Sequence, residues 1–381
     1  MLLHPDGSEE VLVDAGEGAV TDPFVSFDAG WVYYAFFHQV NPVGSYNISR
    51  AGSDIFKIDL ESREIVQLTH QEFTPNMGAG TWTPDSVADN PVWTVNSLVH
   101  GMINLAPCPL AGGKIAFVSS RNAFTPPKLY YTAPTLQLFV MDEDGSNVQC
   151  IAPMTIGSVM HPTPLKDGRI LFSSYESQGL RDLRMWGVWA IWPDGRHWEP
   201  VMSAFMQAQA LHFSTQLSDE NIVIENYYNL NNFGFGTLYS MPPRPPAGEA
   251  PFQSWIRKDN TSLTDVRASG LVWDQQMSFT PKDIEVLTPF TNGADEAAPA
   301  GTSGTRVGKF THPCGAPNND LLVVWSPGPV NALNRPTSLP APHAGIYLIP
   351  GGQPGNTPDD FVKNKNNGNY NEVWPRPVVT Y

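Results

Sequence analysis

The chain has 381 residues, of which 41% are hydrophobic and only 15% are charged, and its formal net charge is −15. Because this acidic balance repels nucleic acid and anionic membranes, neither is expected as a partner. The sequence contains no run of about 18 apolar residues, so we predict no membrane-spanning helix. Its first residues, MLLHPDGSEE, lack the basic and apolar segments of a signal peptide.

The 36 prolines and 32 glycines predict many turns and few exposed helices. A chain of this size that is rich in turns can form one large all-β unit, since such folds run long as single domains. The three cysteines, Cys108, Cys150 and Cys314, are odd in number and form no closely spaced pair. This spacing argues against a disulfide framework.

The first fifteen residues have the pattern of an outer β-hairpin. Asp6-Gly7 lies between apolar residues, which predicts a two-residue turn with positive φ at both turn residues. The same hairpin pattern returns three more times along the chain, each time with an apolar residue seven positions after the acidic turn residue. These apolar residues are Val13, Leu68, Ile151 and Val201.

A second repeated pattern is a short strand with a proline, a turn, and an apolar strand. It is most regular in MHPTPLKDGRILFSS, residues 160–174. Copies that align without gaps begin at Asp22-Pro23, Ala106-Pro107 and His312-Pro313, and a less regular copy covers residues 211–225. Repeats of about 40–50 residues built from short strands are typical of a β-propeller.

We therefore predict an all-β fold, a β-propeller of four-stranded blades, as a single domain over residues 1–381. Each blade combines the proline-containing hairpin with the outer hairpin. The predicted blades cover residues 22–70, 104–152, 158–203, 209–290 and 308–381, and residues 1–15 form a partial blade. Five blades and this partial blade make six the simplest number of blades for a closed ring.

The fourth and the last of these predicted blades contain long loops, and their outer strands come from later segments. DIEVLTPF, residues 283–290, is predicted to close the fourth blade, and HAGIYLIP with NEVWPRPVV is predicted to supply both outer strands of the last. Residues 1–15 are then the outer strands of a sixth blade between the blades that begin near Gly308 and Asp22. We expect its inner strands to come from outside this sequence or from a neighbouring chain, and the sequence to be part of a longer polypeptide.

Three blocks of the sequence, QLFVMDEDGSNVQCI, HPTPLKDGRILFSSYE and GVWAIWPDGRHWEP, resemble a known family. This family is the propeller domain named after the middle domain of the hydrazine synthase alpha subunit, a group related to the TolB-like propellers. The resemblance covers most of residues 20–381. It implies an exported bacterial protein, periplasmic or extracellular, and in hydrazine synthase a domain packed beside c-type haem. The sequence has no CxxCH motif, so we expect no covalent haem in this chain.

Rotational repeats place equivalent residues in a ring, and one such position, at the start of the innermost strand, is expected to face a mouth of the central channel. It holds Asp22, Ala106, His161 and His312, with His212 or Phe213 in the irregular copy. Imidazole is a common ligand for transition metals, so His161, His212 and His312 with Asp22 form a candidate site for a divalent transition metal. The alternative is structural, with each histidine bonding the backbone of a neighbouring blade.

Other side chains suggest binding. The loop at residues 174–187 gathers the candidate ligand-binding residues Tyr175, Glu176, Arg181 and Arg184, which suit an anion or a sugar. The alternative is a salt-bridged loop that packs on the next blade. Cys108 and Cys314 both align with Thr163 in the inner strand and are either packed hydrophobes or reactive thiols, whereas Cys150 belongs to an outer strand and is expected in the core.

The sequence favours two functions. The first is an accessory domain of an exported bacterial protein that binds other protein segments, subunits or carbohydrate, in a redox assembly of the hydrazine synthase alpha kind. The alternative is a metal-dependent enzyme, a polysaccharide lyase or oxidoreductase, with a histidine site at the channel mouth; TolB-like propellers include polyuronate lyases with such sites. The sequence contains no phosphate-binding loop and no GxSxG motif.

Overall fold

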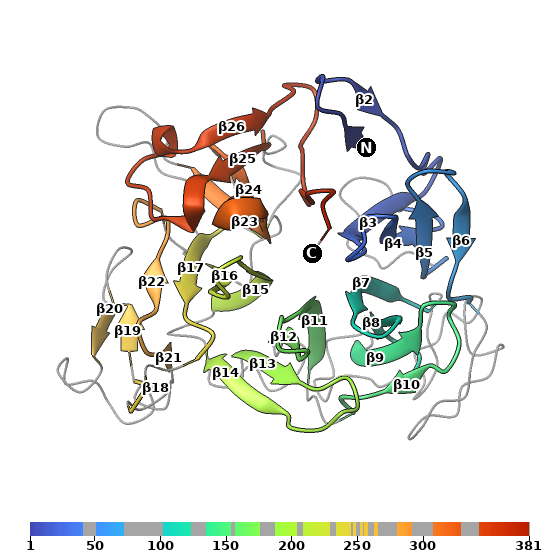
Figure 1. Ribbon diagram of the computed structural model, residues 1–381, viewed down its shortest axis with the longest axis horizontal. Helices are drawn as coiled ribbons and strands as arrows, with labels where there is room; N and C mark the ends of the chain where they lie inside the picture. The colour runs from blue at the N-terminus through green and yellow to red at the C-terminus, as the bar shows by residue number, and fades with distance from the viewer. Residues whose placement is uncertain are drawn as a thin grey trace. The chain divides into compact units, whose positions relative to one another are not determined.

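Five antiparallel sheets of four strands each make up most of the described part of the structure, a computed structural model (Figure 1). The described residues are 1–40, 51–71, 102–122, 135–153, 157–175, 187–203, 209–228, 234–244, 247–248, 252–253, 255–257, 263–265, 280–291, 308–328 and 343–380.

The first two sheets are each built from consecutive strands. The first contains β3 (Ala19–Val25), β4 (Trp31–Phe37), β5 (Ser53–Asp59) and β6 (Ile65–Gln67). The second contains β7 (Asn104–Leu110), β8 (Lys114–Ser119), β9 (Gln137–Asp142) and β10 (Gln149–Cys150).

The remaining three sheets follow the same order from inner to outer strand. The third contains β11 (Ser158–Pro164), β12 (Ile170–Tyr175), β13 (Gly187–Ile191) and β14 (Glu199–Ser203). The fourth contains β15 (Gln209–Gln216), β16 (Ile222–Tyr228), β17 (Thr237–Met241) and β22 (Glu285–Val286). The fifth contains β23 (Lys309–Gly315), β24 (Leu321–Ser326), β25 (Gly345–Ile349) and β26 (Val362–Lys365).

Small elements complete the described residues. Three two-stranded sheets pair β1 (Leu2–Leu3) with β2 (Glu9–Glu10), β18 (Phe252–Gln253) with β21 (Thr280–Pro281), and β19 (Trp255–Arg257) with β20 (Leu263–Asp265). Short 3-10 turns are η5 (Pro317–Asn319), η8 (Pro350–Gly352) and η9 (Pro358–Asp360). No helix in the described part of the chain is long and apolar enough to cross a lipid bilayer.

The predicted all-β propeller with four-stranded blades is confirmed. The five sheets begin and end close to the five predicted spans, and β22 lies inside DIEVLTPF, where the outer strand of the fourth blade was expected. The described residues contain five four-stranded sheets, and β1 and β2 pair there only with each other. The count of six blades therefore stays a prediction.

The outer strand of the fifth sheet was predicted wrongly. The sequence pattern favoured NEVWPRPVV, but β26, Val362–Lys365, pairs with β25 instead. The sequence of β26 is VKNK, and its first three residues are exposed, so it has no apolar alternation to mark it as a strand. Figure 1 draws the chain after β26 as a red coil without arrows.

The Asp-Gly turns have a different geometry from the predicted one. In the turn around Asp6, the Gly7 N–H donates to the His4 carbonyl and the His4 N–H donates to the Ser8 carbonyl. Gly7 has φ +85°, whereas Asp6 is not among the residues with positive φ. This is a type I turn followed by a left-handed glycine bulge, in place of the predicted two-residue turn.

The aspartate carboxylate explains this preference. In the turns at residues 4–8, 142–146, 165–169 and 192–196, the aspartate Oδ1 accepts the backbone N–H two residues later, at 2.8–3.0 Å. This local bond holds aspartate in a right-handed turn conformation, and only the following glycine needs the left-handed region.

The chain divides into two compact units, Met1–Pro162 with Val378–Tyr381, and Thr163–Pro377. In the first unit, apolar residues of the first two sheets share one cluster, which contains Tyr33, Ile55, Phe117 and Phe139. In the second unit, one cluster joins the third and fourth sheets and another joins the fourth and fifth. Strands such as β24, LLVVWS, are apolar at consecutive positions because apolar side chains of other elements pack on both of their faces.

Candidate functional site

One residue inside the innermost strand of each four-stranded sheet, rather than at its predicted start, adopts a left-handed backbone conformation. These residues have φ between +43° and +52° and are Asp22, Ala106, His161, Phe213 and His312. We call this place the bulge position. The strand register shifts there in the four inner hairpins whose pairing is described, those of β3, β7, β15 and β23.

A left-handed conformation costs a residue with a side chain about 1–2 kcal/mol. Four of the five residues precede a proline, which disfavours the right-handed α region for the residue before it. Bulges occur next to functional sites because they change the direction of a side chain. The conformation recurs in every sheet, so it is a property of the repeat rather than of one residue.

The repeat pattern identified this shared position and left His212 or Phe213 open for the irregular copy. The structure assigns Phe213, since Phe213 has φ +43° and β15 shifts register between His212 and Ser214. His212 is the residue before it. It is buried, and its Nδ1 lies 3.2 Å from the Tyr227 hydroxyl.

In the second unit, the bulge positions build an aromatic cluster around His312. The Phe213 ring centroid lies 4.0 Å from that of His312, and the Trp374 centroid lies 4.5 Å from it. The His312 side chain is buried, and neither of its ring nitrogens has a hydrogen-bond partner among the described residues. A buried polar group without a partner is unfavourable, so this imidazole is suited to bind something further.

A fully buried carboxyl group lies beside this cluster. Glu225 Oε2 accepts a hydrogen bond from Thr311 Oγ1 at 2.9 Å, and the His312 backbone N–H also donates to the carboxyl group. Glu225 Oε1 has no partner among the described residues. Burial raises the pKa of Glu225 well above its ordinary value and so favours the neutral acid, the form that can donate a hydrogen bond.

The two histidines of this region are neutral as well. Burial lowers the pKa of His212 to about 3, and burial with repulsion from Arg376 lowers the pKa of His312 to about 3. Both imidazoles therefore stay uncharged at neutral pH, each with one nitrogen able to donate and one able to accept. The two imidazoles therefore offer hydrogen-bonding groups without charge.

In the first unit, neighbouring bulge positions are also in contact. The Ala106 backbone N–H donates to Asp22 Oδ2 at 3.3 Å, and Thr21 Oγ1 donates to the same oxygen at 3.3 Å. The Asp22 carboxylate thus bonds the backbone at the bulge position of the next sheet. This is the type of structural contact expected for the histidines of the ring as the alternative to metal binding.

The predicted metal ligands are divided between the two units, with Asp22 and His161 in the first and His212 and His312 in the second. Among the described residues, no group of three or more His, Cys, Asp or Glu side chains is arranged to hold a metal ion. Of the predicted ligand-binding residues, Glu176, Arg181 and Arg184 lie outside the described residues. Tyr175 ends β12, and only its backbone is described.

The cysteines have the surroundings of packed residues. None of the three described cysteines forms a disulfide bond; Cys108 and Cys314 are buried in β7 and β23, and Cys150 is half-buried against the core of the first unit. Burial raises the pKa of Cys150 to about 11, which keeps the thiol protonated and unreactive. Cys108 and Cys314 occupy the place of Thr163 two residues after the bulge position, as the alignment predicted.

Sequence reasoning missed a buried polar network in the first unit. The Asp54 carboxylate accepts hydrogen bonds from His38 Nε2 at 2.7 Å, Thr69 Oγ1 at 2.8 Å, Gln71 Nε2 at 3.1 Å and Asn104 Nδ2 at 3.2 Å. Gln137 holds the equivalent place in the second sheet, so the repeat itself does not require a charge there.

Arg121 balances this charge from the next sheet. Its Nη2 donates to Asn104 Oδ1 at 3.2 Å, and its guanidinium lies 5.1 Å from the ring centroids of both Phe117 and Phe139. Burial lowers the pKa of Arg121 to about 10, although Asp54 acts against this shift. No motif marks this network in the sequence, because the residues bonded to Asp54 are 15 to 50 residues away from it in the chain.

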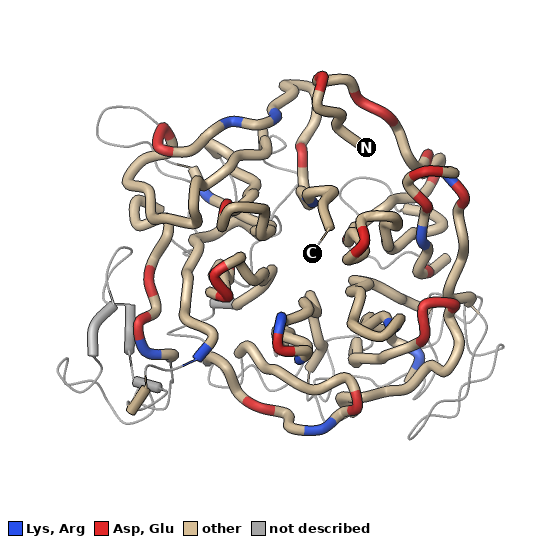
Figure 2. Tube along the Cα trace, in the orientation of Figure 1, with Lys and Arg blue, Asp and Glu red and all other residues tan. Residues whose placement is uncertain are grey.

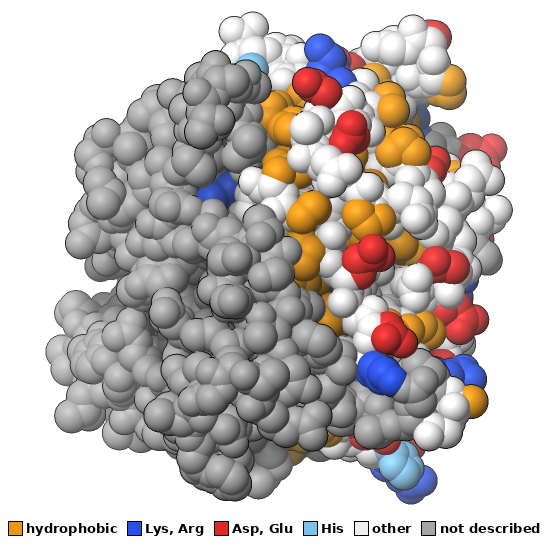
Figure 3. Space-filling view, turned by 90° about the vertical axis from the view of Figure 1, so that its left-hand side faces the viewer, with side chains coloured by type: hydrophobic (Ala, Val, Ile, Leu, Met, Phe, Trp, Pro, Cys, Tyr) orange, Lys and Arg blue, Asp and Glu red, His pale blue; other side chains and the backbone are white. Residues whose placement is uncertain are grey.

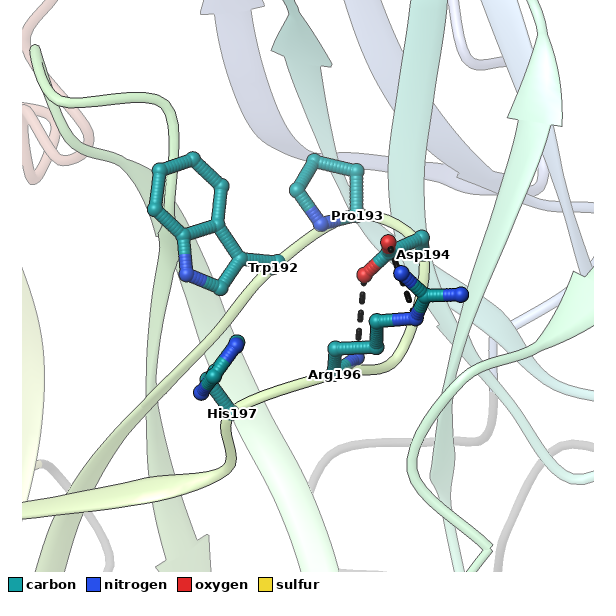
Figure 4. Close-up of a pocket in the computed structure, with 5 residues that line it drawn as sticks. All are labelled: Trp192, Pro193, Asp194, Arg196 and His197. Carbon is teal, nitrogen blue, oxygen red and sulfur yellow. Dashed lines mark hydrogen bonds and ion pairs between the residues drawn. The ribbon is translucent and has the colours of Figure 1, made fainter.

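A surface hollow of about 460 Å³ lies at the outer hairpin of the third sheet (Figure 4). Its lining residues all come from one turn and are Trp192, Pro193, Asp194, Arg196 and His197. Arg196 bonds Asp194 through its backbone N–H at 3.0 Å and its side chain at 3.6 Å, so these charges already pair with each other. The hollow follows from the shape of this turn.

The described part of the face in Figure 3 shows no single-sign charge patch. Figure 3 shows acidic and basic side chains scattered among hydrophobic and uncharged ones on the side of the molecule at the left of Figure 1. This leaves the cluster around His312 as the best-formed candidate site of the described residues.

No protein-family model matches the sequence, and no curated protein sequence matches it. Solved structures do match. Hydrazine synthase of Kuenenia stuttgartiensis is 14% identical, with a TM-score of 0.53, over 97% of this chain and 43% of that chain. TolB of Acinetobacter baumannii is 12% identical, with a TM-score of 0.43, over 91% of this chain and 56% of that one. Oligogalacturonate lyase of Vibrio parahaemolyticus is 14% identical, with a TM-score of 0.39, over 88% of this chain and 78% of that chain.

These identities are low, so the likeness concerns the fold alone. This chain spans less than half the length of the hydrazine synthase chain that it matches. The four-stranded sheets and this structural match together show that the chain has the β-propeller fold found in hydrazine synthase.

Proposed function

We propose that this chain is the ligand-binding β-propeller domain of a larger exported bacterial protein, and that it has no catalytic reaction of its own. The cluster of Phe213, Glu225, His312 and Trp374 is the proposed binding site. The observation that carries the proposal is the buried His312 imidazole, both of whose nitrogens lack a partner among the described residues. The resemblance of the sequence blocks to an exported family supports the location.

The chemistry of the cluster favours a small neutral polyhydroxylated ligand, such as a sugar. Burial favours the neutral acid at Glu225, and His312 is a neutral imidazole at neutral pH. A charged ligand would lose its hydration without a full counter-charge from these groups, which is costly. Aromatic rings with a few hydrogen-bonding groups between them are typical of small-molecule sites, because rings pack on the apolar faces of the ligand.

The neutral histidines also support a binding role rather than proton transfer. An efficient general acid or base has a pKa near the working pH, whereas the pKa values of His212 and His312 are about 3. Such imidazoles donate and accept hydrogen bonds but do not change protonation near pH 7. The assembly partners in this proposal are other segments or subunits of the larger protein.

The test is ligand-observed NMR with D-glucose, D-galactose and D-xylose as probes, on the unchanged chain and on His312→Phe. Phenylalanine already occupies the equivalent bulge position as Phe213, so this variant is expected to fold. We expect at least one sugar to bind the unchanged chain and to bind His312→Phe at least about tenfold more weakly, the loss of a well-placed hydrogen bond. His343→Phe, at an exposed histidine, is the matched control.

Two results would overturn the proposal. One is that no sugar binds, or that His312→Phe binds as tightly as the unchanged chain. The other is a stoichiometric transition metal in untagged protein that is lost in His312→Phe, which would favour the metal-dependent alternative.

A further inference from the structure

We infer that Trp374 is the gate of the site around His312: its ring closes the site in this structure and moves aside to admit the ligand. The inference rests on the proposed function and adds how access to that site is controlled. All residues that carry it belong to the second unit, Thr163–Pro377.

The site needs an entrance because its polar groups are covered. Glu225 is fully buried, and His312 is 8% exposed. The Trp374 ring centroid lies 4.5 Å from that of His312, and Trp374 is itself half-buried, so it both covers the imidazole and reaches the surface. A small ligand has most of its surface covered when it is bound, so a residue of this cluster must move for the ligand to enter or leave.

Trp374 is held less firmly than the other residues of the cluster. Phe213 lies in β15, between residues that pair with β16. Glu225 lies in β16, which pairs with a strand on each side. Val373 and Trp374 belong to no strand, and their backbone groups make no hydrogen bond with the described residues. A segment with few backbone bonds opens locally at low free energy, so Trp374 is the member of the cluster that is free to move.

The backbone of Trp374 also favours opening. Its φ of +51° lies in the left-handed region, which is strained for a residue with a large side chain. In β3, β7, β15 and β23, paired residues on both sides of the bulge position hold this conformation. Trp374 has no such strand pairing among the described residues, and its contact with His312 holds the closed form instead. Strain of this kind is typical of ligand clamps, and it is released when the gate opens.

The movement is short because the residues before the gate are fixed. The Ala344 N–H donates to Asn371 Oδ1 at 2.9 Å, and the Glu372 N–H donates to the Ala344 carbonyl at 3.2 Å. The Asn367 N–H donates to Glu372 Oε1 at 2.8 Å. These bonds tie the chain up to Glu372 to the start of β25, so the gate turns about the backbone that follows Glu372.

The first experiment measures access to His312 without any ligand. Diethyl pyrocarbonate labels neutral imidazoles, and mass spectrometry of peptides gives the labelling rate of His312 at about pH 7 in the unchanged chain, Trp374→Ala and Trp374→Phe. We expect labelling at least about tenfold faster in Trp374→Ala, because no opening step is then required. Trp374→Phe keeps a smaller ring and should give a rate between the other two.

Two controls accompany this measurement. Trp192→Ala removes a tryptophan of the same unit that is 37% exposed and lies outside the cluster, and it should leave the labelling of His312 unchanged. His343, which is exposed, gives the reference rate of an accessible histidine in each chain.

The second experiment tests whether the gate moves in the unchanged chain and needs no variant. The labelling rate of His312 is measured in urea at concentrations below the unfolding transition. A local opening exposes little surface, so we expect the rate to change by less than about twofold. Exposure through global unfolding would instead rise steeply with urea, in proportion to the population of unfolded chain.

The gate would be overturned if His312 is labelled equally fast in the unchanged chain and in Trp374→Ala. It would also be overturned if the unchanged chain is labelled only as global unfolding permits. If Trp374→Ala does not fold, the urea series and Trp374→Phe decide. A sugar that binds while Trp374→Ala labels at the unchanged rate overturns the gate alone. Faster labelling in Trp374→Ala with no bound sugar supports the gate and overturns the proposed function alone.

Discussion

His312 shows how burial determines the chemistry of a single side chain. Its pKa of about 3 lies far below the value of about 6.5 expected in the unfolded chain. Between these two values the unfolded chain binds a proton that the folded chain does not. The stability contributed by this difference is therefore present above pH 6.5 and is lost as the pH falls towards 3.

We predict that His312→Phe weakens this acid dependence. Between about pH 6 and pH 4, the free energy of unfolding should fall less steeply in the variant, by up to about 1.4 kcal/mol per pH unit. Chemical denaturation at each pH measures the free energy of unfolding and so gives this slope. His343→Phe, at an exposed position, should keep the slope of the unchanged chain. An identical slope in His312→Phe would show that the imidazole titrates normally in the folded chain.

Glu225 gives the opposite pH dependence. Its pKa is raised in the folded chain, so above the ordinary value of about 4.5 the unfolded chain releases a proton that the folded chain retains. Glu225 therefore lowers the free energy of unfolding as the pH rises above 4.5, and this loss grows until the pH reaches its folded pKa.

Glu225→Gln should remove this loss, because glutamine resembles the neutral acid in shape and can donate a hydrogen bond. We predict that the variant is more stable than the unchanged chain at pH 8, and that the difference shrinks as the pH falls to 4.5. Thermal unfolding across this pH range measures the difference in stability, with Glu285→Gln on the exposed side of β22 as the control. A variant that is less stable at pH 8 would indicate that Glu225 is ionised in the folded chain.

At the scale of single elements, the left-handed glycines of the turns differ in what surrounds them. Gly7 and Gly145 have φ +85° and +88° in turns of the same kind. A Cβ atom on Gly7 would meet nothing within 4 Å, whereas one on Gly145 would lie 2.3 Å from the Leu68 carbonyl oxygen. Both positions carry the conformational cost, and only Gly145 adds a steric clash with backbone.

This difference predicts a clear order of stability. Gly7→Ala should cost about 1 kcal/mol through the left-handed conformation alone. Gly145→Ala should cost at least about 2 kcal/mol more, because backbone of the neighbouring sheet must move. Urea denaturation of the two variants compares them directly. Equal costs would mean that the turn of Gly145 shifts away from Leu68 without strain.

The elements also show what the sequence could predict. The X-Pro pairs identified the bulge position because proline restricts the residue before it, and this restriction is local. The strand β26 was missed since VKNK has no apolar period, and the two-residue turns were wrong since the Asp6 carboxylate bonds its own backbone. The pairing of Asp54 with His38 and Asn104 depends on which strands the fold brings together, which no local pattern encodes.

For the molecule as a whole, the net charge is the dominant electrostatic property. The chain has 37 acidic and 22 basic residues, and Figure 2 shows the acidic positions (red) spread over both units. The described ion pairs, such as Arg63 with Glu10 and Arg169 with Asp167, lie near the surface, where such pairs contribute little. Repulsion among the excess carboxylates should therefore outweigh them and oppose the folded state.

We predict that the melting temperature rises when NaCl is increased from about 10 mM to about 150 mM, because salt screens repulsion over distances beyond about 10 Å. Differential scanning calorimetry measures the change. KCl and choline chloride at the same ionic strength should give the same rise if screening is the cause, whereas a rise with one cation alone would indicate a specific ion site. A melting temperature that falls with all three salts would show that the surface ion pairs stabilise the fold more than the excess negative charge destabilises it.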